Sequence, residues 1–435
     1  MTIMLGLIFP HPITILGIGF FAWFFMFFFR EINNRLPVDM VIVLIATLQW
    51  VVAPALSYRL GIDHYKFHMY IPETEYMALA VPAVFLFYLG IRIFQNKENE
   101  YAIVEEVFKK LPSLIQANPA FPVALVFIGL FFTYFERQFP ASLQFVAYLF
   151  SGLKYIGLIY FIFLRWQNGI WLGLSLLILT IYTSLRAGMF HDFILWVIFT
   201  GLYVAQILKP NVLVKWIATG ILIVLLLIIQ LVKVEYREML WAGKIKTGYI
   251  TTYTDLVKEN LEKQELAGTS NLQSMVIRLN QGWIISRIIS RIPEVVPFAE
   301  GETIREAIKA SIAPRLVNPE KKGAGGKENY ERFTGYQLLR TSMGISLLGE
   351  GYANYGKTGA LIFIFFMGVF YSLLLRLVYF LARSYPSLIL WIPLLFLHAI
   401  KAETELIVIL NYMVKSFLLV LLMLWGFSRI LGLKL

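Results

Sequence analysis

Seven arginines lie between residues 278 and 340, and guanidinium groups are the side chains best suited to bind phosphate. A guanidinium donates two parallel hydrogen bonds to phosphate oxygens, which a lysine ammonium cannot do. Arg287 and Arg291 are one helical turn apart and share a face of a helix, whereas Arg278 lies roughly opposite. A diphosphate site and contact with lipid headgroups are both open readings. The full group is Arg278, Arg287, Arg291, Arg305, Arg315, Arg332, Arg340, Lys309, Lys321, Lys322 and Lys327.

Three other positions carry groups that are able to do chemistry. Arg186 follows an apolar stretch in TSLRAGMFHDF. Its position is equally compatible with a functional role and with a side chain that only extends its charge from the membrane to water, called snorkelling. Glu350 stands between two glycines in LLGEGYANYG, which would hold a carboxylate beside a substrate; a solvated loop acid is the alternative. His191 adjoins Asp192, but neighbours on a helix do not face each other, which disfavours a paired base.

Two kinds of site are excluded by pattern. Residues 351–358, GYANYGKT, match the phosphate-binding pattern G-x-x-x-x-G-K-[ST]. That motif needs a buried strand before its loop and a soluble helix after it, and here an apolar segment follows, so we reject nucleotide binding. The five histidines show no metal-ligand spacing, so we expect no metal site.

The composition is that of a membrane protein. The chain has 435 residues, of which 59% are hydrophobic and 15% charged, against about 25% charged in soluble proteins. Cysteine is absent, which excludes disulfides and thiol nucleophiles. The net charge of +11 comes mostly from residues at the ends of apolar runs, which disfavours nucleic-acid binding.

Runs of about 18 or more apolar residues are long enough to cross a bilayer as helices. We therefore predict an all-α polytopic membrane protein with about eleven spans, the first of them an N-terminal apolar block that lacks a cleavage site. The charged segment 95–117 is predicted to be an interfacial amphipathic helix. The spans are 10–29, 38–57, 75–94, 118–135, 141–164, 168–185, 192–208, 212–233, 357–380, 386–400 and 408–430.

Three regions follow from these spans: a transmembrane bundle of about eight spans in 1–233, a large outer loop in 234–356, and about three spans in 357–435. The outer loop is predicted to contain helices at 252–266, 271–292 and 302–312, with a flexible stretch at 321–327.

Orientation follows from the basic residues of alternate loops. The richer set is expected to be cytoplasmic, so the N-terminus and the long loop face outward. The richer set is Arg30, Arg35, Arg92, Lys97, Lys109, Lys110, Arg165, Lys209, Lys215, Arg383, Arg429 and Lys434. The residues predicted to share the outer face are Arg59, Asp63, His64, Lys66, Arg137, Arg186, His191, Asp192, Lys401, Glu403 and Glu405.

Residues 334–368, TGYQLLRTSMGISLLGEGYANYGKTGALIFIFFMG, resemble a segment of the O-antigen polymerase family, the Wzy-type oligosaccharide repeat-unit polymerases. In that family a Gly-Glu-x-Tyr-x-Asn-[Phe/Tyr]-Gly stretch leads into a late transmembrane span. APRLVNPEKK at 313–322 is similar to a Pro-Arg and downstream Lys element of the family. TSLRAG at 183–188 is similar to a Ser-Arg-Gly element, with Leu185 inserted between Ser and Arg.

The resemblance implies a metal-independent glycosyltransferase without cofactors, in the bacterial inner membrane with its active face toward the periplasm. Its substrates would be oligosaccharide units on undecaprenyl diphosphate, its surroundings membrane lipids, and a chain-length regulator protein a further partner. A sugar hydroxyl attacks the anomeric carbon of the growing chain and lipid diphosphate leaves, a step that needs cationic stabilisation. The predicted catalytic residues are Arg186, Arg278, Arg315 and Glu350, and the predicted substrate-binding residues are Arg287, Arg291, Lys321, Arg340, Tyr352 and Asn354.

Other functions remain open alternatives. An O-antigen ligase shares the donor and the architecture but transfers finished glycan to another acceptor. A lipid-linked oligosaccharide flippase or other transporter is disfavoured because the sequence shows no internal repeat and few ionisable residues inside its spans. The identity of the general base is likewise open between Glu350, Glu403, Glu405 and a histidine.

Overall fold

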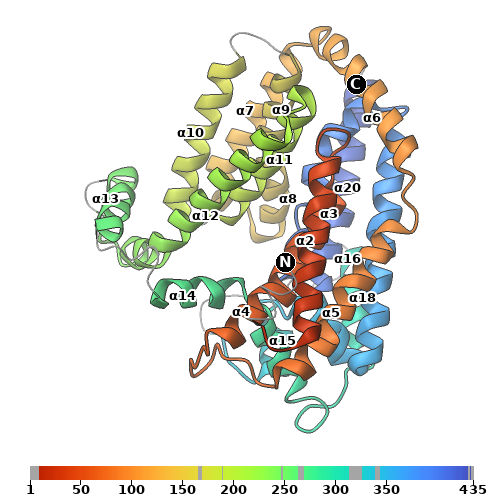
Figure 1. The fold of residues 1–435 in the computed structure, drawn as a ribbon. Coiled ribbons are helices and arrows are strands. Elements are labelled where there is room, and N and C mark those ends of the chain that lie inside the picture. The colour runs from red at the N-terminus through yellow and green to blue at the C-terminus, as the bar shows by residue number, and fades with distance from the viewer. Residues whose placement is uncertain are drawn as a thin grey trace. The chain divides into compact units, whose positions relative to one another are not determined.

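A computed structural model describes residues 9–164, 169–188, 190–245, 248–262, 269–312, 326–338, 343–429 and 432. Within these residues every regular element is a helix, which confirms the all-α prediction (Figure 1). The helices form two compact units. Unit 1 comprises Met1–Arg30, Pro37–Ile103 and Val276–Leu433, and unit 2 comprises Glu31–Leu36, Val104–Met275 and Lys434–Leu435.

Seven helices of the described part are long and apolar enough to cross a membrane, or eight if one bent pair is a single span. The chain is thus a helical membrane protein, and each of the eleven predicted spans has helix at its position. The predicted number is not confirmed, because three of the remaining segments are shorter apolar helices and 118–135 qualifies only together with the preceding helix, at a bend of 87°. The seven are Pro12–Glu31, Val38–Arg59, Glu73–Arg92, Leu143–Phe163, Val212–Ile229, Ser346–Ala382 and Leu406–Arg429.

The helices predicted between the spans are present, with two corrections. Helix α16 (Glu302–Ile312) has the predicted bounds, and α6 (Lys97–Gln116) is the amphipathic helix predicted at 95–117. The helix predicted at 252–266 begins earlier, as α13 (Tyr249–Glu262). The helix predicted at 271–292 is two helices, α14 (Thr269–Leu279) and α15 (Gly282–Ile289).

The limits predicted for the long outer loop, residues 234 and 356, do not coincide with helix ends. Helix α12 (Val212–Trp241) continues beyond the first limit, and α18 (Ser346–Ala382) begins before the second. The residues of the segment are also divided between the two units, since those up to Met275 belong to unit 2 and those from Val276 onward belong to unit 1. The segment therefore contributes to two helical bodies.

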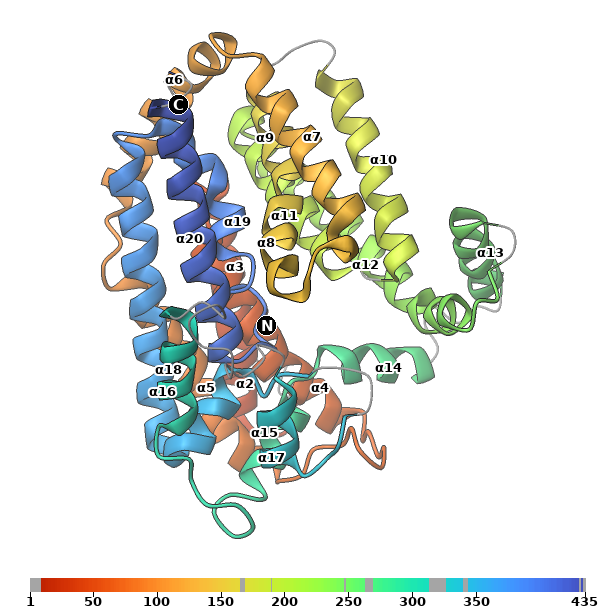
Figure 2. The same ribbon diagram turned by 180° about the vertical axis from the view of Figure 1, so that it is seen from behind.

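In unit 1, the first residues of four long helices lie at one end, which we call the site end (Figures 1 and 2). These helices are α2 (Pro12–Glu31), α5 (Glu73–Arg92), α18 and α20 (Leu406–Arg429). The Thr14 hydroxyl donates to Glu73 at 2.5 Å, and the Ser346 hydroxyl donates to the Ala402 carbonyl at 2.7 Å. Helices α4 (Ala53–Arg59), α15 and α17 (Lys327–Thr334) lie at the same end.

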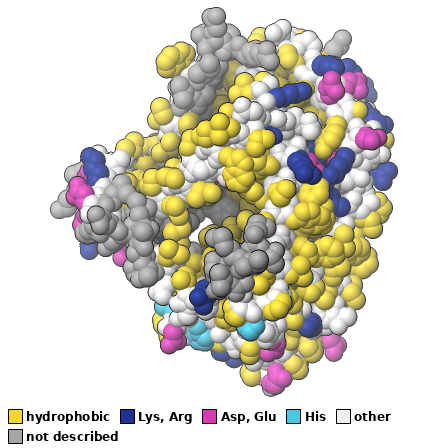
Figure 3. Space-filling model, viewed as in Figure 1, with side chains coloured by type: hydrophobic (Ala, Val, Ile, Leu, Met, Phe, Trp, Pro, Cys, Tyr) yellow, Lys and Arg dark blue, Asp and Glu magenta, His cyan; other side chains and the backbone are white. Residues whose placement is uncertain are grey.

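Hydrophobic side chains cover the middle of the visible face of unit 1, and charged side chains gather toward its two ends (Figure 3). This distribution is what a helical bundle surrounded by hydrocarbon requires, because charged groups are costly at the bilayer centre. Helix α18 is kinked at Gly356, and its part after the kink, residues 357–382, extends for about 39 Å. It exceeds the roughly 30 Å of a hydrocarbon core, which leaves part of the helix outside the apolar layer.

Close packing of α5 on α18 depends on two glycines. A Cβ atom at Gly90 would lie 2.3 Å from the carbonyl oxygen of Phe365, and one at Gly368 would lie 2.5 Å from that of Phe87. Small residues at such a crossing let the two backbones touch, which is how helices commonly associate within membranes.

The chain returns from the far end of α18 to the start of α20 through the interior of unit 1. The return consists of a 3-10 turn, Pro386–Trp391, followed by α19 (Ile392–Phe396). Apart from Pro386, every residue of these two elements is buried, so the segment predicted as a span at 386–400 is an internal element of the unit.

Unit 2 is a separate set of helices. Within it, the end of α10 (Gly169–Ala187) is fixed by α12. The Tyr236 hydroxyl donates to the Leu185 carbonyl at 3.0 Å, and the Arg237 guanidinium donates to the Gly188 carbonyl at 2.5 Å. Unit 2 also contains α7 (Ala120–Phe135), α8 (Ala141–Ser151), α9 (Leu153–Leu164), α11 (His191–Leu208) and α13, together with parts of α6 and α14.

Candidate functional site

A proline within the second span prepares the place where α15 docks. Pro54 has no N–H, so the carbonyl of Trp50 lacks its helical partner, and residues 48–52 adopt a π-helical turn. The Trp50 carbonyl accepts instead from the Tyr76 hydroxyl at 2.8 Å. The neighbouring Gln49 carbonyl accepts from the backbone N–H of Gln281 at 3.1 Å, at the residue before α15. The Trp50 and Gln49 carbonyls therefore hold α5 and the start of α15 against this part of the second span.

Arg287, on α15, lies between two tyrosines from distant parts of the chain. Its guanidinium carbon is 4.7 Å from the ring centre of Tyr70 and 5.2 Å from that of Tyr336. Its Nε donates to the carbonyl of Thr334 at 3.1 Å. The two tyrosine hydroxyls lie 2.6 Å apart. Aromatic faces attract a cation and fix its orientation, so Arg287 is positioned before any ligand binds.

Two further cations complete this group, which we call the cation–tyrosine cluster: Lys66, Tyr70, Arg287, Arg291 and Tyr336. The Lys66 ammonium lies 4.8 Å from the ring centre of Tyr336. The Arg291 guanidinium packs against Gly335, whose φ of +75° is in the left-handed region. A Cβ atom at Gly335 would lie 2.9 Å from the guanidinium carbon, so the residue must be glycine for both reasons.

The three cations of the cluster have no carboxylate within 4.0 Å among the residues that the structure describes. Arg332 on the neighbouring helix α17 differs, because its guanidinium is paired with Glu302 at 3.0 Å. All three cations of the cluster are partly exposed at the site end. Three positive charges without a counter-ion attract an anion with several oxygens, and phosphate groups fit guanidinium forks.

Tyr70 and Tyr330, which lie beside these cations, remain neutral phenols over the physiological range. Burial, and then the hydrogen bond with Tyr336, raise the pKa of Tyr70 above its ordinary value, although Arg287 opposes the rise. Burial likewise raises the pKa of Tyr330 to about 12. These two phenol groups therefore add no negative charge that would neutralise the cluster.

Glu350 is completely buried near the start of α18 and joins three helices. Its carboxylate accepts from the Thr303 hydroxyl of α16 at 2.8 Å and from the backbone N–H of Leu406, where α20 begins, at 2.7 Å. The expected alternative of a solvated loop acid is wrong, because Glu350 lies in a helix with no exposed surface. Both carboxylate oxygens are engaged, which is the arrangement of a positioning residue.

Asn354 extends this network by one helical turn. Its amide nitrogen donates to the Thr303 hydroxyl and to the Glu350 carbonyl, both at 2.8 Å. Its side-chain oxygen accepts from the N–H of Gly301 at 2.9 Å. The predicted substrate-binding roles of Asn354 and Tyr352 stay predictions; Tyr352 packs at the edge of the apolar core that also contacts Tyr70 and Tyr336.

The other predicted site residues are distributed as follows. Arg315, Lys321 and Arg340 lie outside the described residues. Arg278 is partly buried on α14 in unit 1, and Arg186 is exposed at the end of α10 in unit 2. The structure thus brings Arg287 and Arg291 together and places Glu350 and Asn354 in one network at the same end of unit 1.

The segment that matches the nucleotide-binding pattern forms no phosphate loop. Residues 351–358 lie within α18, which is kinked at Gly356, and the described residues around it contain no strand. Lys357 and Thr358 are exposed on the helix surface. Within the described part of the chain, no three histidine or acidic side chains form a metal-ligand set.

Comparison with known proteins places the chain in one family. A family described as a domain of unknown function, DUF8712, matches residues 66–426. The chain belongs to this family. No curated protein and no solved structure matches the chain. The part shared with the DUF8712 family contains all five residues of the cation–tyrosine cluster and the Glu350 network.

Sequence reasoning did not single out Tyr70 or Tyr336 and placed Lys66 only among the outward basic residues. The available signal was the composition of HYKFHMY at 64–70, where basic and aromatic residues are interleaved within a short loop. A second signal was the Tyr at 336 directly after the Gly that ends α17. Neither pattern on its own indicates which distant residues these side chains contact in the folded chain.

Proposed function

We propose that this chain is a membrane glycosyltransferase that joins oligosaccharide repeat units carried on undecaprenyl diphosphate, releasing lipid diphosphate at each transfer. The observation that carries the proposal is the cation–tyrosine cluster at the site end of unit 1. Three cations without a carboxylate partner lie near the surface there, next to the segment whose sequence resembles the O-antigen polymerases.

The proposed reaction makes specific demands on this cluster. A hydroxyl oxygen of one sugar bonds to the anomeric carbon of another, while the bond from that carbon to the diphosphate oxygen breaks. The electron pair of the breaking bond stays on the diphosphate, and its growing charge is stabilised by fixed cations. Arg287 and Arg291 are suited to this role because Tyr70, Tyr336 and Gly335 fix their guanidinium groups in place.

Glu350 is assigned a different part in the proposal. A buried carboxylate that holds Thr303 and the N–H of Leu406 fixes α16 and α20 relative to α18. We propose that it positions the elements around the sugar site, while Arg186, Arg278 and Arg315 remain candidates for diphosphate or acceptor binding. The proton of the attacking hydroxyl passes to a base that Glu403, Glu405 or a histidine could supply.

The test uses purified protein in nanodiscs with a lipid-diphosphate-linked repeat unit and no nucleotide. The proposal expects a ladder of products that differ by one repeat unit, lost on Arg287→Ala and retained on Arg332→Ala. Transfer of glycan to a different lipid acceptor would identify a ligase instead. Movement of the lipid-linked sugar across a liposome bilayer, without any new glycosidic bond, would identify a transporter.

A further inference from the structure

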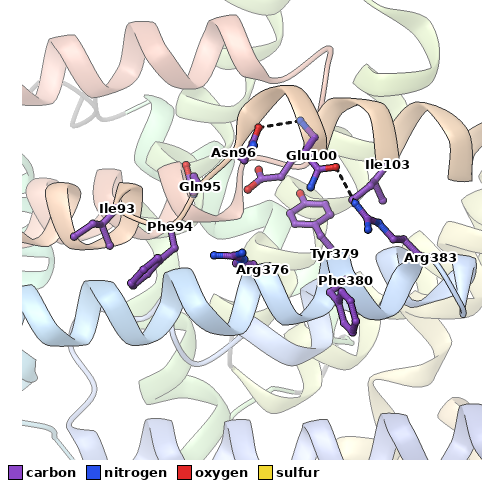
Figure 4. Close-up of a pocket in the computed structure, with 11 residues that line it drawn as sticks. Ile93, Phe94, Gln95, Asn96, Glu100, Ile103, Arg376, Tyr379, Phe380 and Arg383 are labelled. Carbon is purple, nitrogen blue, oxygen red and sulfur yellow. Dashed lines mark hydrogen bonds between the residues drawn. The ribbon is translucent and has the colours of Figure 1, made fainter.

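A second cationic site lies at the end of unit 1 opposite the site end. There a cavity of about 360 Å³ opens between the last turns of α18 and the chain from the end of α5 into α6 (Figure 4). Its lining includes Arg376 and Arg383 from α18, and Phe94, Asn99 and Glu100 from the opposite wall. The charge distribution of the sequence predicts that this end faces the cytoplasm.

The two arginines lie on one face of α18, since seven residues are two helical turns. Figure 4 shows Arg376 extending into the space between the two walls. Arg376 is exposed and has no hydrogen bond or ion pair among the residues that the structure describes. Arg383 donates to the side-chain oxygen of Asn99 at 2.9 Å, and Asn99 in turn is held by Asn96. One guanidinium is therefore fixed and the other is available.

Apolar side chains surround the mouth of this cavity. Phe380, between the two arginines, is 64% exposed, Ile93 is 54% exposed and Phe94 is 38% exposed. Exposed aromatic and aliphatic groups next to arginines at the end of a membrane-crossing helix match the level where headgroups meet acyl chains. The cavity thus offers positive charge to a phosphate and an apolar surface to the chains attached to it.

The charges of the lining favour an anion of low charge. Two guanidinium groups stand against one carboxyl group, that of the buried Glu100. A phosphodiester carries one negative charge. Basic pockets between helices on the cytoplasmic side of membrane proteins commonly bind phospholipid headgroups.

We propose that this cavity binds a phospholipid, with its phosphodiester between Arg376 and Arg383 and its acyl chains along Phe380, Ile93 and Phe94. The site would hold the end of α18 against α6, at the opposite end of the helix that begins with the Glu350 network. It does not depend on the proposed transferase activity, because neither arginine belongs to the cation–tyrosine cluster.

The experiment is native mass spectrometry of the delipidated full-length protein titrated with phosphatidylglycerol. The expected result is that Arg376→Gln combined with Arg383→Gln weakens the first lipid adduct at least about tenfold, as for loss of charge-assisted hydrogen bonds. The matched control is Arg429→Gln, which removes an exposed arginine from the end of α20 at the same end of unit 1 and should leave the adduct unchanged.

The proposal would be overturned if the unmodified protein, the double variant and Arg429→Gln all bound phosphatidylglycerol equally. It would also be overturned if Arg429→Gln lost as much lipid affinity as the double variant. Inorganic phosphate at millimolar concentration should not displace the lipid; full displacement would show a simple anion site and contradict a lipid occupant. If the double variant fails to fold, Arg376→Gln alone decides the matter. That side chain has no protein partner in the described structure, and its loss should still weaken the adduct severalfold.

Discussion

The hydroxyl of Tyr70 lies 2.6 Å from the hydroxyl of Tyr336, although 266 positions separate the two residues. The Arg287 guanidinium packs on both rings, and the Lys66 ammonium packs on the ring of Tyr336. The loop that carries Tyr70 and the loop that carries Tyr336 thus meet at both cations, Arg287 and Lys66. This arrangement fixes positive charge at the site end of unit 1, and the predictions below follow from it and from the Glu350 network.

Replacing Arg287 or Arg291 with alanine should lower kcat/KM for the lipid-linked substrate at least about tenfold for each arginine, the effect of losing a charge-assisted hydrogen bond to phosphate. Steady-state kinetics with the purified variants measures this. The control is Arg332→Ala, because that guanidinium is already paired with Glu302. Equal losses in all three variants would mean that the cluster has no special part in substrate binding.

Gly335→Ala should reduce activity by displacing Arg291, because the new methyl group would meet the guanidinium. Gly61→Ala is the matched control: Gly61 also has a positive φ, of +57°, but nothing lies within 4 Å of its added Cβ. Both variants should lose about 1–2 kcal/mol of stability from backbone strain, measured by thermal unfolding. Only Gly335→Ala should lose transfer activity beyond what this destabilisation explains; similar activities in the two variants would contradict the role given to Arg291.

Glu350→Gln should lower thermal stability, because an amide cannot accept from both Thr303 and the N–H of Leu406. One of these buried donors would face an N–H₂ group, at a cost of about 1–3 kcal/mol. Differential scanning fluorimetry in detergent gives the shift, with Glu328→Gln as a control at an exposed acid of α17. A variant with unchanged stability but no transfer activity would instead identify Glu350 as the base.

The raised pKa of Tyr330 predicts loss of stability at alkaline pH. Its folded pKa of about 12 exceeds that of an unfolded tyrosine, which is about 10. The folded state therefore holds the phenolic proton more tightly, so this contribution is complete below about pH 10 and disappears as the pH rises through about 12. Unfolding temperatures measured from pH 8 to 12 should fall less steeply for Tyr330→Phe than for the unmodified protein. Identical slopes would refute the assignment.

Much of the helical architecture followed from local sequence. Hydrophobic run length placed helix at every predicted span, and the bounds predicted for the helix before Pro314, residues 302–312, are those of α16. The interruption between α14 and α15 was missed, although Asn280 and Gly282 lie at the break, because a single glycine inside a helical pattern is often tolerated. The interruption depends on a distant carbonyl, that of Gln49, which accepts from Gln281.

The sequence predicted the candidate site only in part, because local patterns do not show which distant segments come together on folding. The spacing predicted Arg287 and Arg291 on one side of a helix. Arg287 lies on α15, whereas Arg291 lies two residues beyond the end of that helix, yet both contribute to the cluster. Lys66, Tyr70 and Tyr336 come from loops that meet only in the folded chain, so no local pattern connects them. The glycines on either side of Glu350 suggested a loop, but packing of α16 and α20 against α18 buries that residue within a helix.

The most direct test of the central claim is the affinity of the purified protein for undecaprenyl diphosphate, the proposed leaving group, measured by thermophoresis in detergent. The cation–tyrosine cluster predicts that the double variant Arg287→Ala, Arg291→Ala binds at least about tenfold more weakly, while Arg332→Ala binds as the unmodified protein does. Undecaprenyl monophosphate should bind more weakly than the diphosphate to the unmodified protein. An affinity for the diphosphate that is unchanged in the double variant would contradict the account.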